Sequence, residues 1–214
     1  MRPDSGPSGF WSGLLISMDI DFFGIFTLVT GLIFLVLEIR QNNWMWLMQF
    51  LSSAAAIVSF ASEGLYASAG LNAYYVVMAV VGVYQWRKDA KIVGEANGDS
   101  ETEVVHLRRP GLMVWLVSAA VMLAGTGALY FILRLLNDPM SLTDAAVAVL
   151  SGIATWWLAK SYPQQWLLWV VADVVSAWLC FSQGMIPMTI LYAIYSILAI
   201  YGYIHWVRKG SYIE

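Results

Sequence analysis

Seven apolar stretches alternate with short polar segments along most of this chain. A membrane-spanning helix needs roughly 20 apolar residues, because the hydrocarbon core of a bilayer is about 30 Å thick. The pattern therefore predicts an all-α integral membrane protein with seven transmembrane helices. The predicted spans are residues 20–39, 44–62, 67–86, 111–133, 140–159, 164–183 and 187–206.

The last three stretches repeat the first three at a constant offset of 120 residues, without a gap. Matched pairs at this offset include Trp46 and Trp166, Tyr75 and Tyr195, Gly82 and Gly202, and Trp86 and Trp206. Since the offset equals four spans, an even number, both copies point the same way across the membrane. The sequence therefore predicts a parallel 3+1+3 repeat, an organisation typical of transporters.

Composition agrees with a surface that mostly faces lipid. The 214 residues are 60% hydrophobic and only 12% charged, whereas a soluble domain carries about a quarter charged residues. The single cysteine, Cys180, excludes an internal disulfide and a thiolate metal cluster. His106 and His205 have no second ligand at metal spacing, so we expect neither a metal nor a cofactor.

Lysine and arginine are distributed unevenly between the two sets of loops. One side holds Arg40, Arg87, Lys88, Lys91, Arg108, Arg109, Lys160, Arg208 and Lys209, and the other holds Arg2 and Arg134. Cytoplasmic loops carry the excess of these residues. The distribution therefore predicts an outside N-terminus and a cytoplasmic C-terminus.

The repeat and this topology divide the chain into six parts. These are an N-terminal extracytoplasmic or interfacial segment (1–19), a first three-helix repeat (20–86), a cytoplasmic linker (87–110), a connecting helix (111–133), a second three-helix repeat (140–206) and a cytoplasmic tail (207–214). The linker is rich in Gly, Glu, Asp and Lys and lacks apolar periodicity. We expect it to have little structure of its own.

Asp173 lies near the middle of the sixth span, where a charge costs a few kcal/mol on insertion scales. Trp166 and Trp169 precede it at helical spacing, so the three side chains share one face. The matching stripe of the first repeat contains Trp46 and Gln49. We interpret both stripes as the lining of a substrate pocket between the repeats. The alternative for Asp173 is a structural hydrogen bond to a neighbouring Ser or Tyr.

A second pair of stripes lies on the third and seventh spans. Asn72 and Tyr75 share one face of the third, and Tyr192 and Tyr195 share the equivalent face of the seventh. Pocket lining and helix packing are both compatible with these positions. Thr155 in the fifth span either contacts substrate or donates back to a helix carbonyl.

Trp86 and Trp206 stand beside Arg87 and Arg208 at the ends of their spans. Tryptophan next to cationic residues is typical of the aromatic belt at a membrane surface. We therefore predict that both indoles face the lipid headgroups.

Other classes of seven-helix protein fit less well. A retinal protein needs a lysine in its last span, and 187–206 contains none; a receptor would leave the repeat unexplained. The HExxH and GxSxG signatures of common intramembrane proteases are absent. No glycine-rich nucleotide loop occurs, so we expect a transporter and not an enzyme, working passively, with a coupled ion or with a partner.

Three motifs resemble the PnuC family of bacterial vitamin transporters over residues 20–208. They are Gln165-Trp166-x-x-Trp169-x-x-x-Asp173, Leu65-Tyr66-x-x-x-x-Leu71-Asn72-x-x-Tyr75 and Tyr195-x6-Gly202-x-x-x-Trp206. The resemblance implies the 3+1+3 design shared with SWEET sugar transporters and facilitated diffusion of nicotinamide riboside across the bacterial inner membrane. Thiamine and riboflavin are alternative substrates. It also implies a homotrimer and a cytoplasmic kinase that traps the vitamin, with no nucleic-acid partner.

The same resemblance makes Trp166, Trp169 and Asp173 expected substrate contacts. Asn72 stands where many relatives have Gln, a longer amide side chain. Nicotinamide riboside carries a pyridinium cation, which tryptophan faces stabilise by about 2 kcal/mol or more when desolvated. An ionised Asp173 would neutralise the same cation.

The charge distribution leads to a test of topology. Cysteines introduced as Asn97→Cys and Asp138→Cys should react with an impermeant thiol reagent from opposite sides of the membrane, measured on intact cells and on inverted vesicles. Labelling of both from one side would contradict the 3+1+3 arrangement.

Overall fold

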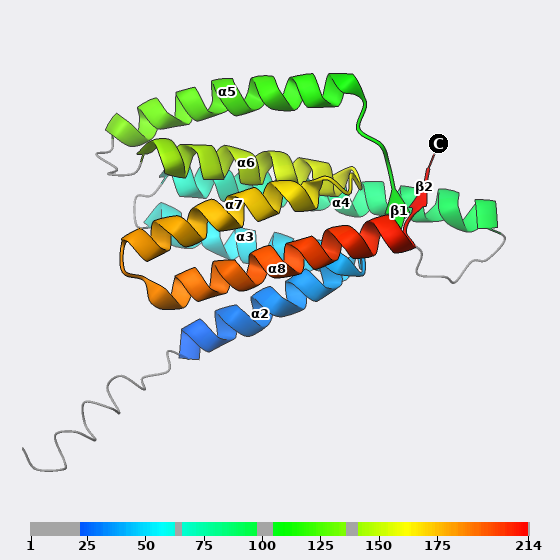
Figure 1. Cartoon of the computed structure of the whole chain (residues 1–214), viewed down its shortest axis with the longest axis horizontal. Coiled ribbons are helices and arrows are strands. Elements are labelled where there is room, and N and C mark those ends of the chain that lie inside the picture. Colours follow the sequence, from blue (N-terminus) through cyan, green and yellow to red (C-terminus); the bar gives the residue numbers. More distant parts are fainter. Residues whose placement is uncertain (1–21, 63–65, 98–104, 136–140, 214) are drawn as a thin grey trace, which may run out of the picture.

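Each long apolar run of the chain forms a helix in the computed structural model, which describes residues 22–62, 66–97, 105–135 and 141–213. The helices are α2 (Phe22–Ile39), α3 (Trp44–Ser62), α4 (Tyr66–Asn97), α5 (Leu112–Leu135), α6 (Ser141–Ala159), α7 (Gln165–Ser182) and α8 (Ile186–Lys209). Two short strands are β1 (His106–Leu107) and β2 (Ser211–Tyr212). The helices run side by side in alternating directions (Figure 1).

Within these described residues, four helices are long and apolar enough to cross a membrane on composition alone: α5, α6, α7 and α8. In α3 a shorter apolar segment spans Trp44–Val58. The protein is therefore a multi-helix, membrane-embedded chain. The predicted N-terminal segment 1–19 lies outside the described residues.

The turns that end α2 and α6 have the same geometry, 120 residues apart. Gln41 and Ser161 adopt left-handed backbone conformations, with φ of 53° and 58°. The Asn42 N–H donates to the Leu37 carbonyl, as the Tyr162 N–H does to Trp157. These bonds complete a Schellman cap, which satisfies helix-terminal carbonyls without a glycine here. The repeat seen in the sequence thus reappears as matched local structure.

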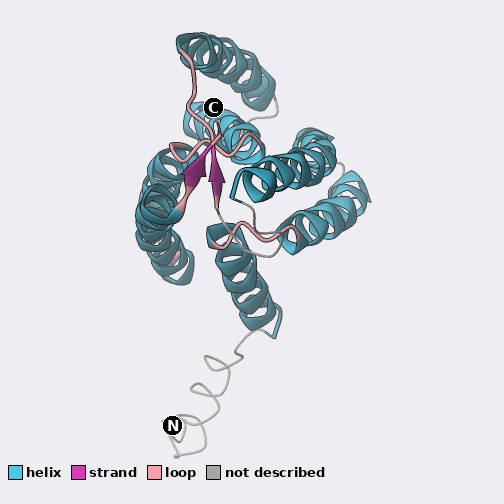
Figure 2. Cartoon of the chain, turned by 90° about the vertical axis from the view of Figure 1, so that its right-hand side faces the viewer, coloured by secondary structure: helices cyan, strands magenta, loops and turns pink. Residues whose placement is uncertain are grey.

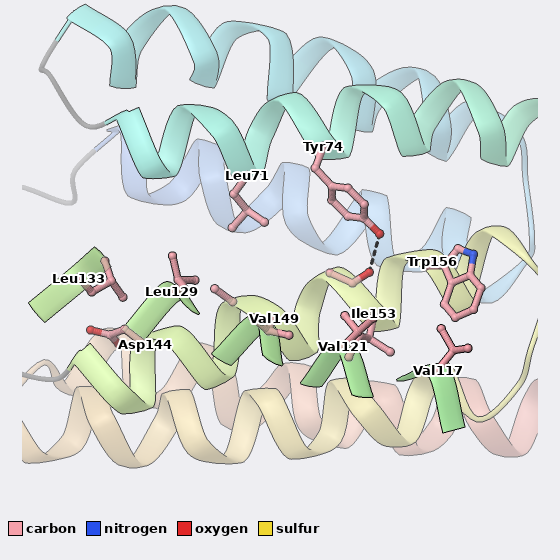
Figure 3. Close-up of a pocket in the computed structure, with 13 residues that line it drawn as sticks. Leu71, Tyr74, Val117, Val121, Leu129, Leu133, Asp144, Val149, Ile153 and Trp156 are labelled. Carbon is pink, nitrogen blue, oxygen red and sulfur yellow. Dashed lines mark hydrogen bonds between the residues drawn. The ribbon is translucent and has the colours of Figure 1, made fainter. Parts of the chain in front are cut away.

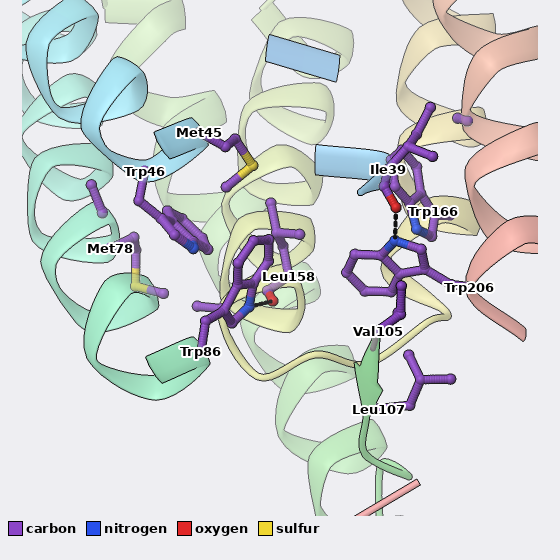
Figure 4. Close-up of a cluster of buried hydrophobic side chains, with 13 residues drawn as sticks. Ile39, Met45, Trp46, Met78, Trp86, Val105, Leu107, Leu158, Trp166 and Trp206 are labelled. Atoms are coloured by element: carbon purple, nitrogen blue, oxygen red, sulfur yellow. Dashed lines mark hydrogen bonds between the residues drawn. The ribbon is translucent and has the colours of Figure 1, made fainter. Parts of the chain in front are cut away.

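Trp86 and Trp206 are fully buried, so the predicted aromatic-belt position of both is wrong. The indole N–H of Trp86 donates to the Leu158 carbonyl at 3.0 Å, and that of Trp206 donates to the Ile39 carbonyl at 2.9 Å (Figure 4). Each acceptor ends a helix of the other repeat, where carbonyls lack intrahelical donors. The hydrogen bond to such a carbonyl stabilises the indole more inside the protein than a position at the lipid surface would.

The linker 87–110 is more structured than its composition suggests. Helix α4 continues to Asn97, well beyond the predicted end at residue 86. Asp89, fully buried, accepts two hydrogen bonds from Arg108 at 2.6 and 3.0 Å and one from Gln85 at 2.9 Å. The Asp89 carboxylate raises the pKa of the Arg108 guanidinium. Buried polar contacts of this kind hold a segment that has no apolar periodicity.

A clasp, which we define as residues 105–108 with their partners, joins the two repeats. The Gln41 side chain donates to the His106 carbonyl at 2.9 Å and accepts from the His106 N–H at 2.7 Å. The Arg108 N–H donates to the carbonyl of Ser161, the repeat equivalent of Gln41. On its other edge β1 pairs in parallel with β2, which lies in the predicted tail. Figure 2 shows both strands between the helix ends.

The clasp predicts unequal effects of two matched substitutions. Gln41→Ala removes both bonds to His106 and leaves a buried N–H and carbonyl unpaired, at a cost of about 1–3 kcal/mol. Ser161→Ala removes a buried hydroxyl that has no partner among the described residues. The thermal midpoint of the purified protein should therefore fall clearly for Gln41→Ala and hardly for Ser161→Ala. Equal midpoints for the two variants would contradict the clasp.

Candidate functional site

The predicted stripe on α7 faces the interior of the protein. Trp166 is fully buried, and its ring meets that of Trp206 edge-on at a centroid distance of 5.6 Å. Gly202 of α8 permits this packing, because a Cβ there would lie 2.8 Å from the Trp166 ring. Trp169 is half-buried against the same core, and Asp173 is 8% exposed. The spacing of the motif thus places all three side chains on the inner face of α7.

The first repeat carries an equivalent arrangement on α3. Trp46 is buried against Gly82 of α4 and meets Trp86 edge-on at 5.1 Å. One turn further along α3, the Gln49 amide donates to the Ser53 hydroxyl at 3.1 Å. Gln49 is therefore engaged within its own helix.

Four buried polar atoms near these stripes have no partner among the described residues. They are the indole Nε1 atoms of Trp46, Trp166 and Trp169, and Oε1 of Gln165. Buried donors and acceptors are almost always paired in folded proteins, so each exception needs an explanation. Acceptors on a bound polar solute or on water would satisfy the three indoles.

A carboxyl pair that the sequence analysis missed lies beside this region. Glu38, only 3% exposed at the end of α2, accepts a hydrogen bond from Gln165 at 3.2 Å. Glu38 and Asp173 interact electrostatically with each other. The sequence signal for Glu38 was a glutamate in the last turn of an otherwise apolar span. From its position alone, such a residue is expected at the membrane surface. The contact links α2 of the first repeat to α7 of the second.

Two predicted tyrosines lie near Asp173. Tyr192 and Tyr195 both interact electrostatically with the Asp173 carboxyl, and their rings meet edge-on at 6.5 Å. The Tyr195 hydroxyl also lies against Gly31 of α2. Asp173 has no hydrogen bond to the side chains that the structure describes. The structure therefore brings together Asp173, Tyr192, Tyr195 and Glu38 from three helices.

The remaining predicted residues form a separate group between α4 and α6. Tyr75 interacts with the Ser151 side chain, and Thr155 donates to the Ser151 carbonyl at 2.8 Å. The Thr155 bond is the intrahelical alternative considered for it. Asn72 is half-buried on α4 and also has an interaction partner within the protein. These side chains are satisfied within the protein, unlike the indoles of α3 and α7.

The cavity in Figure 3 is not lined by Trp46, Trp86, Trp166, Trp169 or Trp206. It has a volume of about 700 Å³ and is lined by apolar residues of α4, α5 and α6, among them Leu71, Val121 and Val149. The Tyr74 hydroxyl crosses one side of it to the Gly152 carbonyl at 2.7 Å. Besides its mainly apolar side chains, the lining includes the Asp144 carboxyl and the Tyr74 hydroxyl.

Comparison with known proteins gives the family. Residues 21–208 match the family model described as nicotinamide mononucleotide transporter. The chain belongs to this transporter family. The match covers most of the chain and confirms the resemblance carried by the three motifs. Members of the family are transporters, which agrees with the prediction that the chain is not an enzyme.

Curated relatives in the family have different vitamins in their names. The chain is 29% identical to the nicotinamide riboside transporter PnuC of Neisseria mucosa over 188 residues, which is 84% of this chain and 70% of that protein. It is also 29% identical to the riboflavin/roseoflavin transporter RibM of Streptomyces davaonensis, over 83% and 81% of the two chains. PnuC of Escherichia coli is 24% identical, over 68% of each chain.

A solved structure supports the fold of this family member. The crystal structure of the vitamin B3 transporter PnuC aligns with a TM-score of 0.64 and 24% identity, covering 94% of this chain and 86% of that one. At this identity the alignment establishes the fold alone.

Proposed function

We propose that this chain carries nicotinamide riboside across the membrane by facilitated diffusion. The observation that carries the proposal is the inner face of α7, where the indole N–H groups of Trp166 and Trp169 have no partner among the described residues and Asp173 is buried farther along the helix. Trp46 is the equivalent unpaired indole on α3. Membership of the family and the names of two relatives support the substrate class.

The chemistry of nicotinamide riboside matches these groups. Its ribose hydroxyls and carboxamide oxygen can accept hydrogen bonds from the indoles of Trp166 and Trp169. Stacking on a tryptophan face and a nearby carboxylate at Asp173 would both stabilise its pyridinium ring. The tyrosines around that carboxyl, Tyr192 and Tyr195, would enclose the ring. In this proposal the role of Glu38 is to hold Gln165 next to the indoles.

Riboflavin is the second candidate, because the chain is as similar to RibM as to PnuC of Neisseria mucosa. Riboflavin is neutral and would gain less from the Asp173 carboxylate than a cation would. Thiamine, which is also cationic, fits the same electrostatic argument. The acidic and aromatic character of the site therefore favours a cationic vitamin over riboflavin.

A parallel 3+1+3 arrangement gives this site a way to open on alternate sides. The matched caps at Gln41 and Ser161 and the matched packing of Trp46 on Gly82 and Trp166 on Gly202 support it. Rocking of one three-helix unit against the other would open the site. Cytoplasmic opening would break the contacts that join the units there, including Gln165 to Glu38. The orientation follows from the charge distribution, with the clasp inside.

Two further properties of the transporter remain predictions that rest on the family resemblance. They are association into a homotrimer and a cytoplasmic kinase that phosphorylates the vitamin after entry. Phosphorylation adds negative charge to the product, which would prevent its return and maintain the gradient for facilitated diffusion.

Reconstitution tests the proposed function directly. Purified protein in liposomes should take up labelled nicotinamide riboside down its gradient, without ATP and with ionophores present to collapse ion gradients. Protein-free liposomes provide the control. A strict requirement for a proton or sodium gradient would contradict facilitated diffusion and would make Asp173 a candidate coupling site.

Binding measurements test the proposed contacts. Asp173→Asn keeps the shape of the side chain but loses its charge, and Trp169→Phe keeps an aromatic face but loses the N–H. Each should weaken nicotinamide riboside binding by about 1.5–3 kcal/mol, roughly ten- to a hundredfold, in calorimetry on the purified variants. Trp178→Phe is the matched control, because Trp178 is 59% exposed on the same helix. Unchanged affinity in both site variants would place the substrate elsewhere.

A further inference from the structure

A groove at the cytoplasmic end of the first repeat shares only Trp46 with the residues predicted to bind substrate. It has a volume of about 1030 Å³ and runs between α3 and α4. Its deeper part is apolar and its outer part is basic. The lining residues are Asn43, Trp44, Trp46, Leu47, Phe50, Ala79, Val80, Val83, Tyr84, Arg87, Lys88 and Lys91.

The groove is apolar along one part and basic along the next, as the apolar acyl chains of a phospholipid are followed by its phosphate. Leu47, Phe50 and Val80 are exposed along its apolar part. Farther along α4, one face continues from Val80 through Tyr84 to Lys91 at helical spacing. Apolar side chains therefore lead directly to cations on one surface.

The cations of the groove are available to a ligand. Within the described part of the chain, Arg87, Lys88 and Lys91 are exposed and form no ion pair. The acid closest to them in sequence, Asp89, is buried in its ion pair with Arg108. Among the side chains that the structure describes, the groove therefore offers three cations without a competing carboxylate.

The repeat provides an internal comparison. The buried floor of the groove is the same in both repeats, since Trp46 and Ala79 correspond to Trp166 and Ala199. Four exposed positions differ: Trp44, Tyr84, Arg87 and Lys91 correspond to Gln164, Ile204, Val207 and Ser211. The helix packing that the two repeats share does not require these four sequence differences. They give the first repeat two aromatic residues and two cations that the second repeat lacks.

We propose that this groove binds an anionic phospholipid of the cytoplasmic leaflet, with its phosphate on Arg87, Lys88 and Lys91 and an acyl chain along Leu47, Phe50 and Val80. Trp44 and Tyr84, 65% and 71% exposed, lie at headgroup depth between these two parts, as amphipathic aromatic rings do at membrane surfaces. Basic pockets between transmembrane helices on the cytoplasmic side recognise lipid phosphates in this way. A zwitterionic lipid would bring its own cation against the three basic side chains.

Lipid binding can be measured apart from transport. Purified protein in detergent is titrated with phosphatidylglycerol and with phosphatidylcholine of the same acyl chains, and bound lipid is counted by native mass spectrometry. The unsubstituted chain should prefer phosphatidylglycerol. Arg87→Gln with Lys91→Gln should weaken phosphatidylglycerol binding by about tenfold or more and leave phosphatidylcholine binding unchanged.

Two further variants make the test specific. Arg208→Gln with Lys209→Gln removes the same number of charges from the end of α8 and should keep the preference for phosphatidylglycerol. Trp44→Gln with Tyr84→Ile gives the groove the side chains of the second repeat and should weaken binding of phosphatidylglycerol. Gel filtration checks that every variant is folded and monodisperse.

Three results would overturn the proposal. Equal binding of the two lipids by the unsubstituted chain would exclude headgroup recognition. Equal loss in both charge variants would show that only overall charge matters. Competition by soluble glycerol phosphate as strong as by the whole lipid would show a simple anion site that does not use the apolar groove.

Discussion

The reciprocal hydrogen bonds of two tryptophans hold the architecture together. Trp86 of the first repeat donates to Leu158 of the second, and Trp206 of the second donates to Ile39 of the first. Both acceptors lie at helix ends inside the protein, where a carbonyl needs donors from the protein itself. These indoles supply the donors and at the same time join the two units. Trp46 and Trp166 then pack edge-on against them, which positions the inner faces of α3 and α7.

The inner tryptophans differ in a way that separates structure from function. Trp86 and Trp206 have paired N–H groups, whereas those of Trp46, Trp166 and Trp169 are buried without a partner among the described residues. Leaving a buried donor unpaired costs about 1–3 kcal/mol. A transporter can tolerate this cost when its substrate supplies the acceptors during each cycle. The same reasoning explains why Asp173, a costly group inside a membrane span, lies among tyrosines rather than in a fixed ion pair.

The two repeats share a scaffold but differ in side chains at the end where the clasp lies. Their caps and tryptophan–glycine contacts match, because these features determine how the helices pack. At Gln41 and Ser161 the same backbone geometry serves different purposes: one side chain binds the main chain of His106, and the other residue contributes only its carbonyl. The clasp and the basic groove on α4 both lie where the two repeats differ in sequence.

The sequence by itself determined the helices, the repeat and the family, since apolar run length, a constant offset and short motifs are local properties of a chain. It also placed Trp166, Trp169 and Asp173 on one helix face, because that follows from helical spacing. Only the tertiary structure decided that Trp86 and Trp206 are buried, that Glu38 meets Gln165 and that residue 106 docks on Gln41. These contacts join residues 65 to 167 positions apart. Whether a tryptophan or glutamate at a helix end faces lipid or protein depends on which distant carbonyl or amide the packing brings to it.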